Sequence, residues 1–243
     1  MGVLDGQVAL ITGASRGIGK GIALAFAQAG ASLTIAARNV ELLEQAATEL
    51  RTYGPPVLAV PTDVSEEAQV QRLFERALSA HGRLDVLVNN AGVGRHAPIV
   101  DSDMNDWDAT IATNLRGPFL CTRAALRAMI PRKRGRIINI ASISSQRVRP
   151  HTASYSASKF GLWGLTQVTA LEGRPHGISC SCLNPGNVRV ERRVERSSEL
   201  DREPMMVPAE LAQIAVLMAA LPPHVNLLEA TVLPVGQLFV GRG

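Results

Sequence analysis

The chain has few aromatic residues, few cysteines and no apolar run long enough to cross a membrane. Phe, Trp and Tyr make up 4% of its 243 residues, which leaves little for stacking the bases of single-stranded nucleic acid. The longest apolar stretch near the C-terminus, residues 211–221, is interrupted by Gln213 and is too short to span a bilayer. Residues 1–6 contain no basic segment that leads into a long apolar one, so we expect no secretory signal.

The three cysteines are Cys121, Cys180 and Cys182, without a CxxC motif or a nearby histidine cluster. An odd number of thiols favours a reducing, cytoplasmic compartment, and we expect them to pack in the core and bind no metal.

The remaining composition is that of an ordinary globular domain. Hydrophobic residues reach 46% and charged residues 19%, and the formal net charge is +4. This length suits one domain, which we expect to span residues 1–243. Residues 187–207 are charged and interrupted by Pro204, and we interpret them as a loop that covers the substrate.

Two hydrophobic periodicities alternate along the chain. Short β-rich runs predict strands at 7–12, 32–37, 57–60, 84–89, 136–140, 178–183 and 230–235. Helical spacing predicts helices at 17–28, 41–51, 66–80, 105–129, 154–171 and 208–219, with Asp103 as the N-cap of the longest. Apolar strands joined by helical crossovers form parallel sheets that are covered on both faces. The sequence therefore predicts an α/β fold, a single doubly wound parallel sheet of about seven strands of the Rossmann type.

A glycine-rich turn, TGASRGIG at residues 12–19, joins the first strand to the first helix. Glycines at such a turn let the backbone approach a diphosphate, and the N-terminus of the helix attracts the anion. The alternative phosphate motif GxxxxGK[ST] fails at Ala14 and at Gly21. A tight turn that binds no ligand is the other interpretation.

The end of the second strand bears on the choice of dinucleotide. It reads Ala37-Arg38-Asn39 and lacks the acidic residue that usually binds the ribose 2′-hydroxyl of NAD. Arg38, with Arg16 from the glycine turn, can instead pair with a 2′-phosphate. These residues favour NADP(H), and the alternative is that both arginines are surface residues without a role.

Four polar residues suggest proton transfer to a carbonyl oxygen. Tyr155 and Lys159 are four residues apart on one helix face, and Ser142 ends the fifth strand. Hydride delivery to a ketone develops negative charge on oxygen, so a phenol could donate the proton, an ammonium could stabilise the phenolate and a hydroxyl could hold the oxygen. Asn114 lies in an apolar helix, where its amide could hold a water for proton relay or simply pack against a local partner.

Seven motifs follow one another along the chain. They are residues 12–19, Asp63-Val64, NNAG at 89–92, Asn114, Ser142, Tyr155 with Lys159, and Pro185-Gly186. In this order they resemble the short-chain dehydrogenase/reductase family over essentially the whole sequence.

The resemblance implies a catalytic tetrad of Asn114, Ser142, Tyr155 and Lys159, with Lys159 also bonded to the nicotinamide ribose. It places Asp63 and Val64 near the adenine and residues 185–188 near the nicotinamide. The expected cofactor-binding residues are Gly13, Ser15, Arg16, Gly17, Ile18, Gly19, Arg38, Asn39, Asp63, Val64, Asn90, Ala91, Gly92, Tyr155, Lys159, Pro185, Gly186 and Val188. The resemblance further implies a homotetramer or homodimer that acts on a small-molecule carbonyl or alcohol.

Two departures from the family pattern limit the substrate assignment. Val190 stands where the family often has a threonine that bonds the carboxamide, and residues 233–243 differ from the ending of acyl-carrier-protein reductases. A 3-oxoacyl-thioester reductase is the alternative within enzymes, and it would need a basic patch beside the cleft, for which residues 132–136 are the candidate. The alternative of another class is a non-catalytic dinucleotide-sensing protein, which is disfavoured because the tetrad is complete.

The remaining charged motifs predict no metal site and no nucleic-acid partner. Residues 101–106 begin like a calcium loop but have Asp106 where glycine is needed, so an acidic helix N-terminus is the better interpretation. Acidic residues interleave with the arginines of 189–202, as on a solvated, charge-paired face. His96 and His151 could line a substrate pocket, although we expect surface positions.

Overall fold

All strands of the sheet run parallel in a computed structural model that describes residues 2–190 and 203–239. The seven strands are β1 (Val8–Thr12), β2 (Ser32–Ala37), β3 (Val57–Pro61), β4 (Val86–Asn89), β5 (Gly135–Ile140), β6 (Ile178–Pro185) and β7 (Glu229–Val232). Their order in the sheet is β3-β2-β1-β4-β5-β6-β7. This arrangement confirms the doubly wound Rossmann-type sheet that the periodicity predicted.

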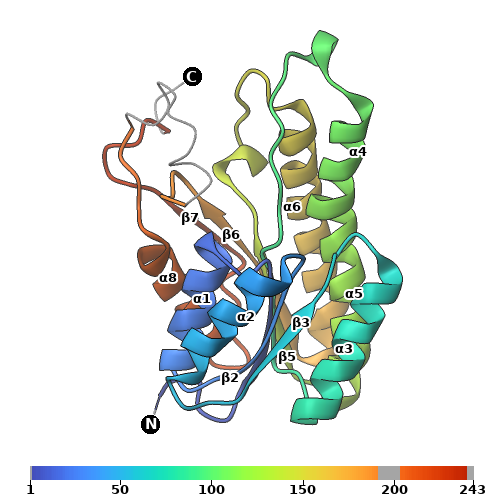
Figure 1. Ribbon diagram of the computed structural model, residues 1–243, viewed down its shortest axis with the longest axis vertical. Helices are drawn as coiled ribbons and strands as arrows, with labels where there is room; N and C mark the ends of the chain where they lie inside the picture. The colour runs from blue at the N-terminus through green and yellow to red at the C-terminus, as the bar shows by residue number, and fades with distance from the viewer. Residues whose placement is uncertain (1, 191–202, 240–243) are drawn as a thin grey trace.

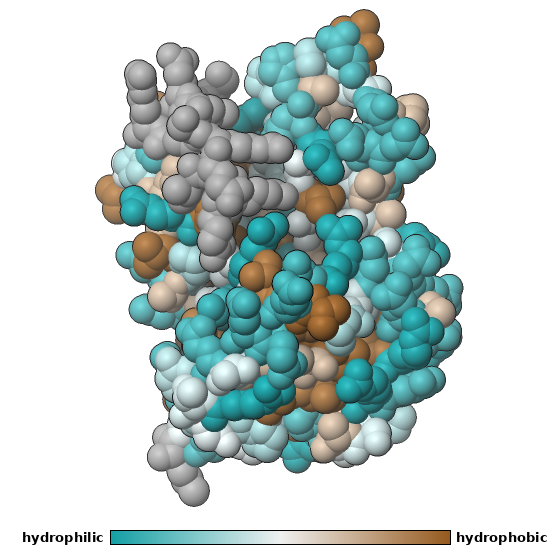
Figure 2. Space-filling view, in the orientation of Figure 1, coloured by the Kyte–Doolittle hydropathy of each residue, from teal (hydrophilic) through white to brown (hydrophobic). Residues whose placement is uncertain are grey.

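Helices cover both faces of the sheet (Figure 1). They are α1 (Gly17–Gln28), α2 (Val40–Arg51), α3 (Glu67–His81), α4 (Met104–Ile111), α5 (Gly117–Met129), α6 (Ala153–Gly173) and α8 (Pro208–Ala220). Apolar side chains of α1, α2 and α8 form one core with the sheet, and those of α3 and α5 form another on the opposite face. Hydrophilic residues cover much of the visible surface (Figure 2). No helix in the described ranges is both long enough and apolar enough to span a bilayer.

The strand order reverses between β1 and β4, and this reversal creates the site. The chain leaves β1 toward α1 and β2 on one side, whereas the loops after β4 and β5 lead toward the other side. In doubly wound sheets, such a switch point opens a crevice at the carboxyl ends of the strands. Thr12, Asn89, Ile140 and Pro185 end the four strands that meet there.

The helix expected over 105–129 is not continuous. Asp103 caps α4 as predicted, because its Oδ1 accepts from the backbone N–H groups of Asn105 at 2.7 Å and Asp106 at 3.3 Å. A π-helical segment, Ala112–Arg116, then separates α4 from α5. Pro118 has no N–H to donate to the carbonyl of Asn114 four residues back, which explains why regular α-helical bonding fails here.

The last described strand is shorter than predicted, and the three cysteines lie in the core as expected. The strand predicted at 230–235 is shorter, Glu229–Val232, since Pro234 cannot donate a ladder hydrogen bond. Cys121, Cys180 and Cys182 are all free and buried. The charge-paired face expected at 189–202 falls mostly on residues 191–202, which lie outside the described residues, as does the middle of the loop expected at 187–207.

Candidate active site

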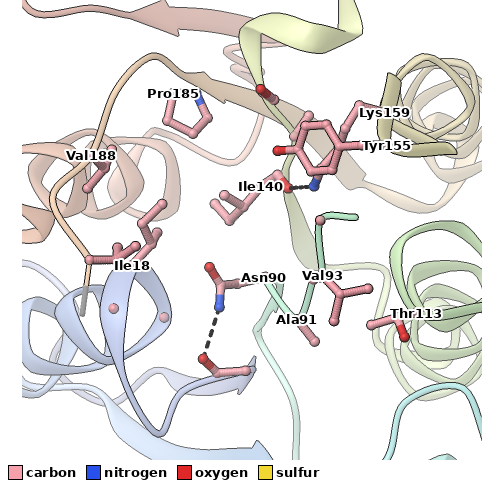
Figure 3. A pocket seen from close by; sticks show the side chains of 18 of the residues that line it. Ile18, Asn90, Ala91, Val93, Thr113, Ile140, Tyr155, Lys159, Pro185 and Val188 are labelled. Carbon is pink, nitrogen blue, oxygen red and sulfur yellow. Dashed lines mark hydrogen bonds between the residues drawn. The ribbon is translucent and has the colours of Figure 1, made fainter. Parts of the chain in front are cut away.

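A cleft of about 970 Å³ opens at the carboxyl ends of the strands. The glycine turn and the ends of β2 and β3 line one part of it, and the loops after β4, β5 and β6 line the rest. Figure 3 shows Ile18 from the glycine turn across from Tyr155 and Lys159. Every cofactor-binding residue expected from the sequence borders this cleft, and so do Ser142, Tyr155 and Lys159. Asn114 is the exception, because it is buried behind the cleft wall.

The glycine turn is joined to the loop after β4 by a short hydrogen-bond network. Thr12 Oγ1 accepts from the backbone N–H groups of Asn90 at 3.0 Å and Ala91 at 3.1 Å. In return, Asn90 Nδ2 donates to the carbonyl oxygens of Thr12 at 2.9 Å and Gly13 at 3.1 Å. Gly13 has a φ of +65°, and a Cβ there would lie 2.8 Å from the Ala91 Cα. Only glycine allows the two loops to approach this closely.

The N-terminus of α1 fits a dinucleotide diphosphate. Arg16 is its N-cap but makes no side-chain capping bond, and the first turn of the helix contains no acidic residue. The N–H groups at the start of the helix therefore keep their positive partial charge, and residues 17–19 place them along the cleft. An anion would satisfy these donors without displacing a side chain of the protein.

The end of β2 presents an arginine that is only loosely paired. The Arg38 side chain is 65% exposed, and its Nη1 lies 3.7 Å from Asp63 Oδ2, which is too long for a hydrogen bond. Asp63 itself accepts from the backbone N–H of Ser65 at 3.0 Å and from its hydroxyl at 2.7 Å. Asn39 caps α2, because its side-chain Oδ1 accepts from Leu42 N–H at 2.8 Å. Arg38 can therefore turn toward an anionic ligand at little cost.

Lys159 and Tyr155 lie together at the other part of the cleft (Figure 3). The Lys159 side chain is buried, and its Nζ donates to the Ile140 carbonyl at 2.9 Å. The same Nζ lies 5.7 Å from the centroid of the half-buried Tyr155 ring. No carboxylate among the described residues pairs with this ammonium, so its charge acts on the neighbouring phenol and on whatever occupies the cleft.

Ser142 follows β5 and has one hydroxyl hydrogen left to donate. Its Oγ accepts from the Ser144 backbone N–H at 3.1 Å and makes no other hydrogen bond within the described residues. The Ser142 carbonyl accepts from Ser145 Oγ at 2.6 Å, which holds the turn in place. The hydroxyl of this nearly buried residue is thus oriented by the backbone and can donate into the cleft.

The side-chain amide of Asn114 has hydrogen-bond partners within the protein. Its Oδ1 accepts from Val93 N–H at 2.8 Å, while its Nδ2 donates to the Val93 carbonyl at 2.8 Å and to Ser158 Oγ at 3.1 Å. The amide thus joins the cleft-lining loop after β4, at Val93, to α6 at Ser158. This bonding matches the local partner that the sequence left open, and the role of Asn114 in proton relay stays a prediction.

Several cleft residues were missed or underrated from sequence. His96 and His151 were expected at the surface, and both are exposed but also line the cleft. Thr62 and Arg149 line it as well, although nothing in their local sequence marks them. Thr12 belongs to a motif that was recognised, yet its role as acceptor for two backbone amides depends on a loop far away in the chain.

The basic run at 132–136 does not lie beside the cleft. Arg132 Nη1 donates to the Leu84 carbonyl and to Asp85 Oδ1, both at 3.2 Å, just before β4 begins. Arg136 donates to the carbonyls of Leu221 and Pro222. These contacts are at the amino ends of the strands, opposite the cleft, so this run is not the carrier-protein patch that a 3-oxoacyl-thioester reductase would need.

Comparison with known proteins identifies the family. The short chain dehydrogenase model matches residues 7–201. A 3-oxoacyl-[acyl-carrier-protein] reductase of Synechocystis sp. is 37% identical over 214 residues, which cover 88% of this chain and 85% of the relative. The crystal structure of a metagenomic short-chain oxidoreductase in complex with NADP is 37% identical, with a TM-score of 0.84 over 96% of this chain and 98% of that one.

An alcohol dehydrogenase from Thermococcus sibiricus, complexed with 5-hydroxy-NADP, is 30% identical with a TM-score of 0.88 and covers 95% of this chain and 97% of that one. Enzymes of this family act on small molecules with a nicotinamide cofactor. The chain belongs to the short-chain dehydrogenase/reductase family and is a nucleotide-binding oxidoreductase.

Proposed function

We propose that the protein is an NADP(H)-dependent oxidoreductase that interconverts a carbonyl compound and a secondary alcohol. One observation carries this proposal. Tyr155, Lys159 and Ser142 meet in the same cleft whose other part is formed by the glycine turn and the uncapped N-terminus of α1. A cofactor that binds at the turn and extends along the cleft would bring its nicotinamide to these three side chains.

The side chains divide the proton chemistry among them. NADPH supplies a hydride for the carbonyl carbon when it is bound, and NADP⁺ accepts one in the reverse direction. Tyr155 donates its hydroxyl proton to the carbonyl oxygen, and the Lys159 ammonium beside it stabilises the phenolate that remains. Ser142 donates a hydrogen bond to the same oxygen while negative charge develops there. Asn114 supports the site by holding Val93 in position.

Substitution of Tyr155 tests this assignment directly. Tyr155→Phe removes the proton donor but keeps the ring, so we expect turnover to fall by orders of magnitude while the affinity for cofactor stays near that of the wild type. Tyr53→Phe is the matched control, because Tyr53 is the only other tyrosine and is 43% exposed. Near-normal turnover in Tyr155→Phe would refute the proposed role.

The preference for NADP(H) rests on Arg38 and Arg16. Both line the cleft, and Arg38 is only loosely paired with Asp63. We expect NADPH to bind at least about tenfold more tightly than NADH, roughly 1.4 kcal/mol, in calorimetric titrations. Arg38→Gln is expected to remove most of this difference, and the exposed Arg51→Gln on α2 should leave it unchanged. Equal affinity of the wild type for the two cofactors would refute the preference.

A 3-oxoacyl-thioester reductase is the second candidate, supported by the similarity to the Synechocystis relative. Turnover of acetoacetyl-coenzyme A that exceeds that of simple ketones of equal length would favour it. Binding of NADPH without turnover of any carbonyl compound would instead favour a non-catalytic dinucleotide-sensing protein.

The assembly and setting of the enzyme are also proposed from the family resemblance. We propose a homotetramer or homodimer, in which residues 187–207 cover the substrate. A single-subunit mass by light scattering would refute the assembly. The three free thiols agree with a reducing, cytoplasmic setting.

A further inference from the structure

The substrate part of the cleft contains two basic side chains, Lys159 and Arg149. The other ionisable residues that line it there are Tyr155, His96 and His151. Among the described lining residues there is one carboxylate, Asp63, and it belongs to the cofactor part, 3.7 Å from Arg38. Any charged group that selects a substrate in the described part of this cleft is therefore positive.

Arg149 stands out because no described residue accepts a hydrogen bond from its side chain. Its side chain is 29% exposed, yet its guanidinium makes no hydrogen bond to any of the described residues. Arg136 shows the usual behaviour of such a group, since its guanidinium donates to the carbonyls of Leu221, Pro222 and Val225. A guanidinium that is partly withdrawn from water needs partners for its five donors, and a planar anion is the partner that matches their geometry.

Glu203 forms a long ion pair with Arg149 but accepts no hydrogen bond from it. Glu203 Oε2 lies 3.7 Å from Arg149 Nη2, which is within ion-pair range but beyond hydrogen-bond distance. The same Oε2 accepts from Asn187 Nδ2 at 2.8 Å, so Glu203 is also committed to the segment after β6. The ion pair keeps Arg149 close to Glu203, and no described residue accepts a hydrogen bond from its guanidinium.

The loop that carries Arg149 is held in place by hydrogen bonds to its backbone carbonyls. The Arg149 carbonyl accepts from Thr152 Oγ1 at 2.6 Å, and the His151 carbonyl accepts from Ala97 N–H at 3.0 Å. His151 has a φ of +65°, a left-handed conformation that costs a residue other than glycine roughly 1–2 kcal/mol. Such strain persists where the surroundings over-determine it, and it often marks a binding site.

We propose that Arg149 binds an anionic group of the substrate, so that the enzyme acts on carbonyl compounds or alcohols that carry a carboxylate or a phosphate. Arg149 is then a specificity-determining residue, and Tyr155 acts on the carbonyl at the other end of the same molecule. The inference rests on the proposed function for the reacting carbonyl. The anion itself follows from Arg149 and from the charges that line the cleft.

Matched substrate pairs test the inference. The acids are pyruvate, acetoacetate and levulinate, each compared with its methyl ester, and dihydroxyacetone phosphate is compared with dihydroxyacetone. Turnover is measured with NADPH, and binding is measured by calorimetry on the complex with NADP⁺, in which no ketone can be reduced. The variants are Arg149→Gln, which removes the charge, and Arg149→Lys, which keeps it. Arg147→Gln is the control, because Arg147 is exposed, two residues away and not among the cleft-lining residues.

The expected result is specific to the charged member of a pair. At least one anion is preferred over its neutral partner by about tenfold or more in kcat/KM, roughly 1.4 kcal/mol. Arg149→Gln loses this preference through KM while the neutral compound is little affected, Arg149→Lys retains part of it, and Arg147→Gln retains all of it. A preference confined to the phosphate pair would identify the anion as phosphate, and one confined to the oxo acids would identify it as carboxylate.

Other outcomes overturn the inference or separate it from the proposed function. The absence of any preference for an anion, in both turnover and binding, overturns it. Equal losses on charged and neutral compounds in Arg149→Gln also overturn it, because they indicate a structural role. If the NADP⁺ complex binds an anion through Arg149 but no carbonyl is reduced, the proposed function fails and the inference stands.

Discussion

Replacement of Asn114 by alanine should destabilise the fold measurably, because three hydrogen bonds depend on this amide. The side chain is fully buried and bonds to both backbone groups of Val93 and to Ser158 Oγ. The two backbone groups are only part-buried and can be reached partly by water, so losing their partner should cost about 1 kcal/mol each. The space left by the amide adds about 1 kcal/mol more, for a total of roughly 2–4 kcal/mol.

The matching aspartate variant separates hydrogen bonding from volume. Asn114→Asp keeps the volume of the side chain and can still accept from Val93 N–H. The carboxylate oxygen that replaces the donor Nδ2, however, then faces two acceptors. These are the Val93 carbonyl and Ser158 Oγ, which already donates to the Tyr155 carbonyl at 2.7 Å. An ionised carboxylate cannot satisfy either acceptor, whereas a protonated one can donate to one of them. Asn114→Asp should therefore lose less stability at acid pH, near the ordinary carboxyl pKa of about 4, than at neutral pH.

Urea unfolding at fixed protein concentration measures these effects. Asn105→Ala is the control, since Asn105 is exposed on α4, and it should change the free energy of unfolding by less than about 0.5 kcal/mol. Asn114→Ala should also lower kcat/KM, because Val93 lines the cleft. If the free energy of unfolding of Asn114→Ala is within about 0.5 kcal/mol of the wild-type value, the hydrogen bonds of Asn114 contribute no stability and this reasoning is wrong.

Two further predictions concern the amino ends of the strands and the buried thiols. Arg136→Met should lower the free energy of unfolding by about 2–3 kcal/mol, because it removes the charged donor for the carbonyls that follow α8, while Arg134→Met at an exposed position should have little effect. Similar urea midpoints for the two variants would contradict this. Burial raises the pKa of Cys121 and of Cys182 to about 12, so a thiol reagent should react with neither in the folded protein at pH 8 and with both after unfolding. Because the folded pKa values of these thiols lie above the unfolded ones, the stability that they contribute is complete below about pH 8.5 and declines as the pH rises above it. Rapid labelling of the native protein, or a free energy of unfolding that increases above pH 9, would contradict the burial of these thiols.

The motifs that identify the cleft could be predicted from sequence because each is local. The glycine turn belongs to one strand-to-helix connection, and Tyr155 and Lys159 share one helix face. Their meeting in one cleft also followed, since the carboxyl ends of parallel strands lie at one edge of the sheet. The roles of individual side chains were harder to infer. For Asn114 the sequence left open a water-holding amide or a local partner, and only the position of Val93, which is distant in sequence, shows which protein groups its amide bonds.

The sequence by itself determined the order of strands and helices, the parallel sheet and the family, because hydrophobic periodicity and turn chemistry act over a few residues. It did not predict the interruption at Ala112–Arg116 or the early end of the last described strand, although Pro118 and Pro234 lack the N–H groups that would continue these elements. Only the tertiary structure decided which side chains face one another across loops. Three findings depend on distances between segments far apart in the chain, which no local pattern encodes: the hydrogen bonds of Asn114 to Val93, the position of residues 132–136 away from the cleft, and Arg149 donors that no described residue fills.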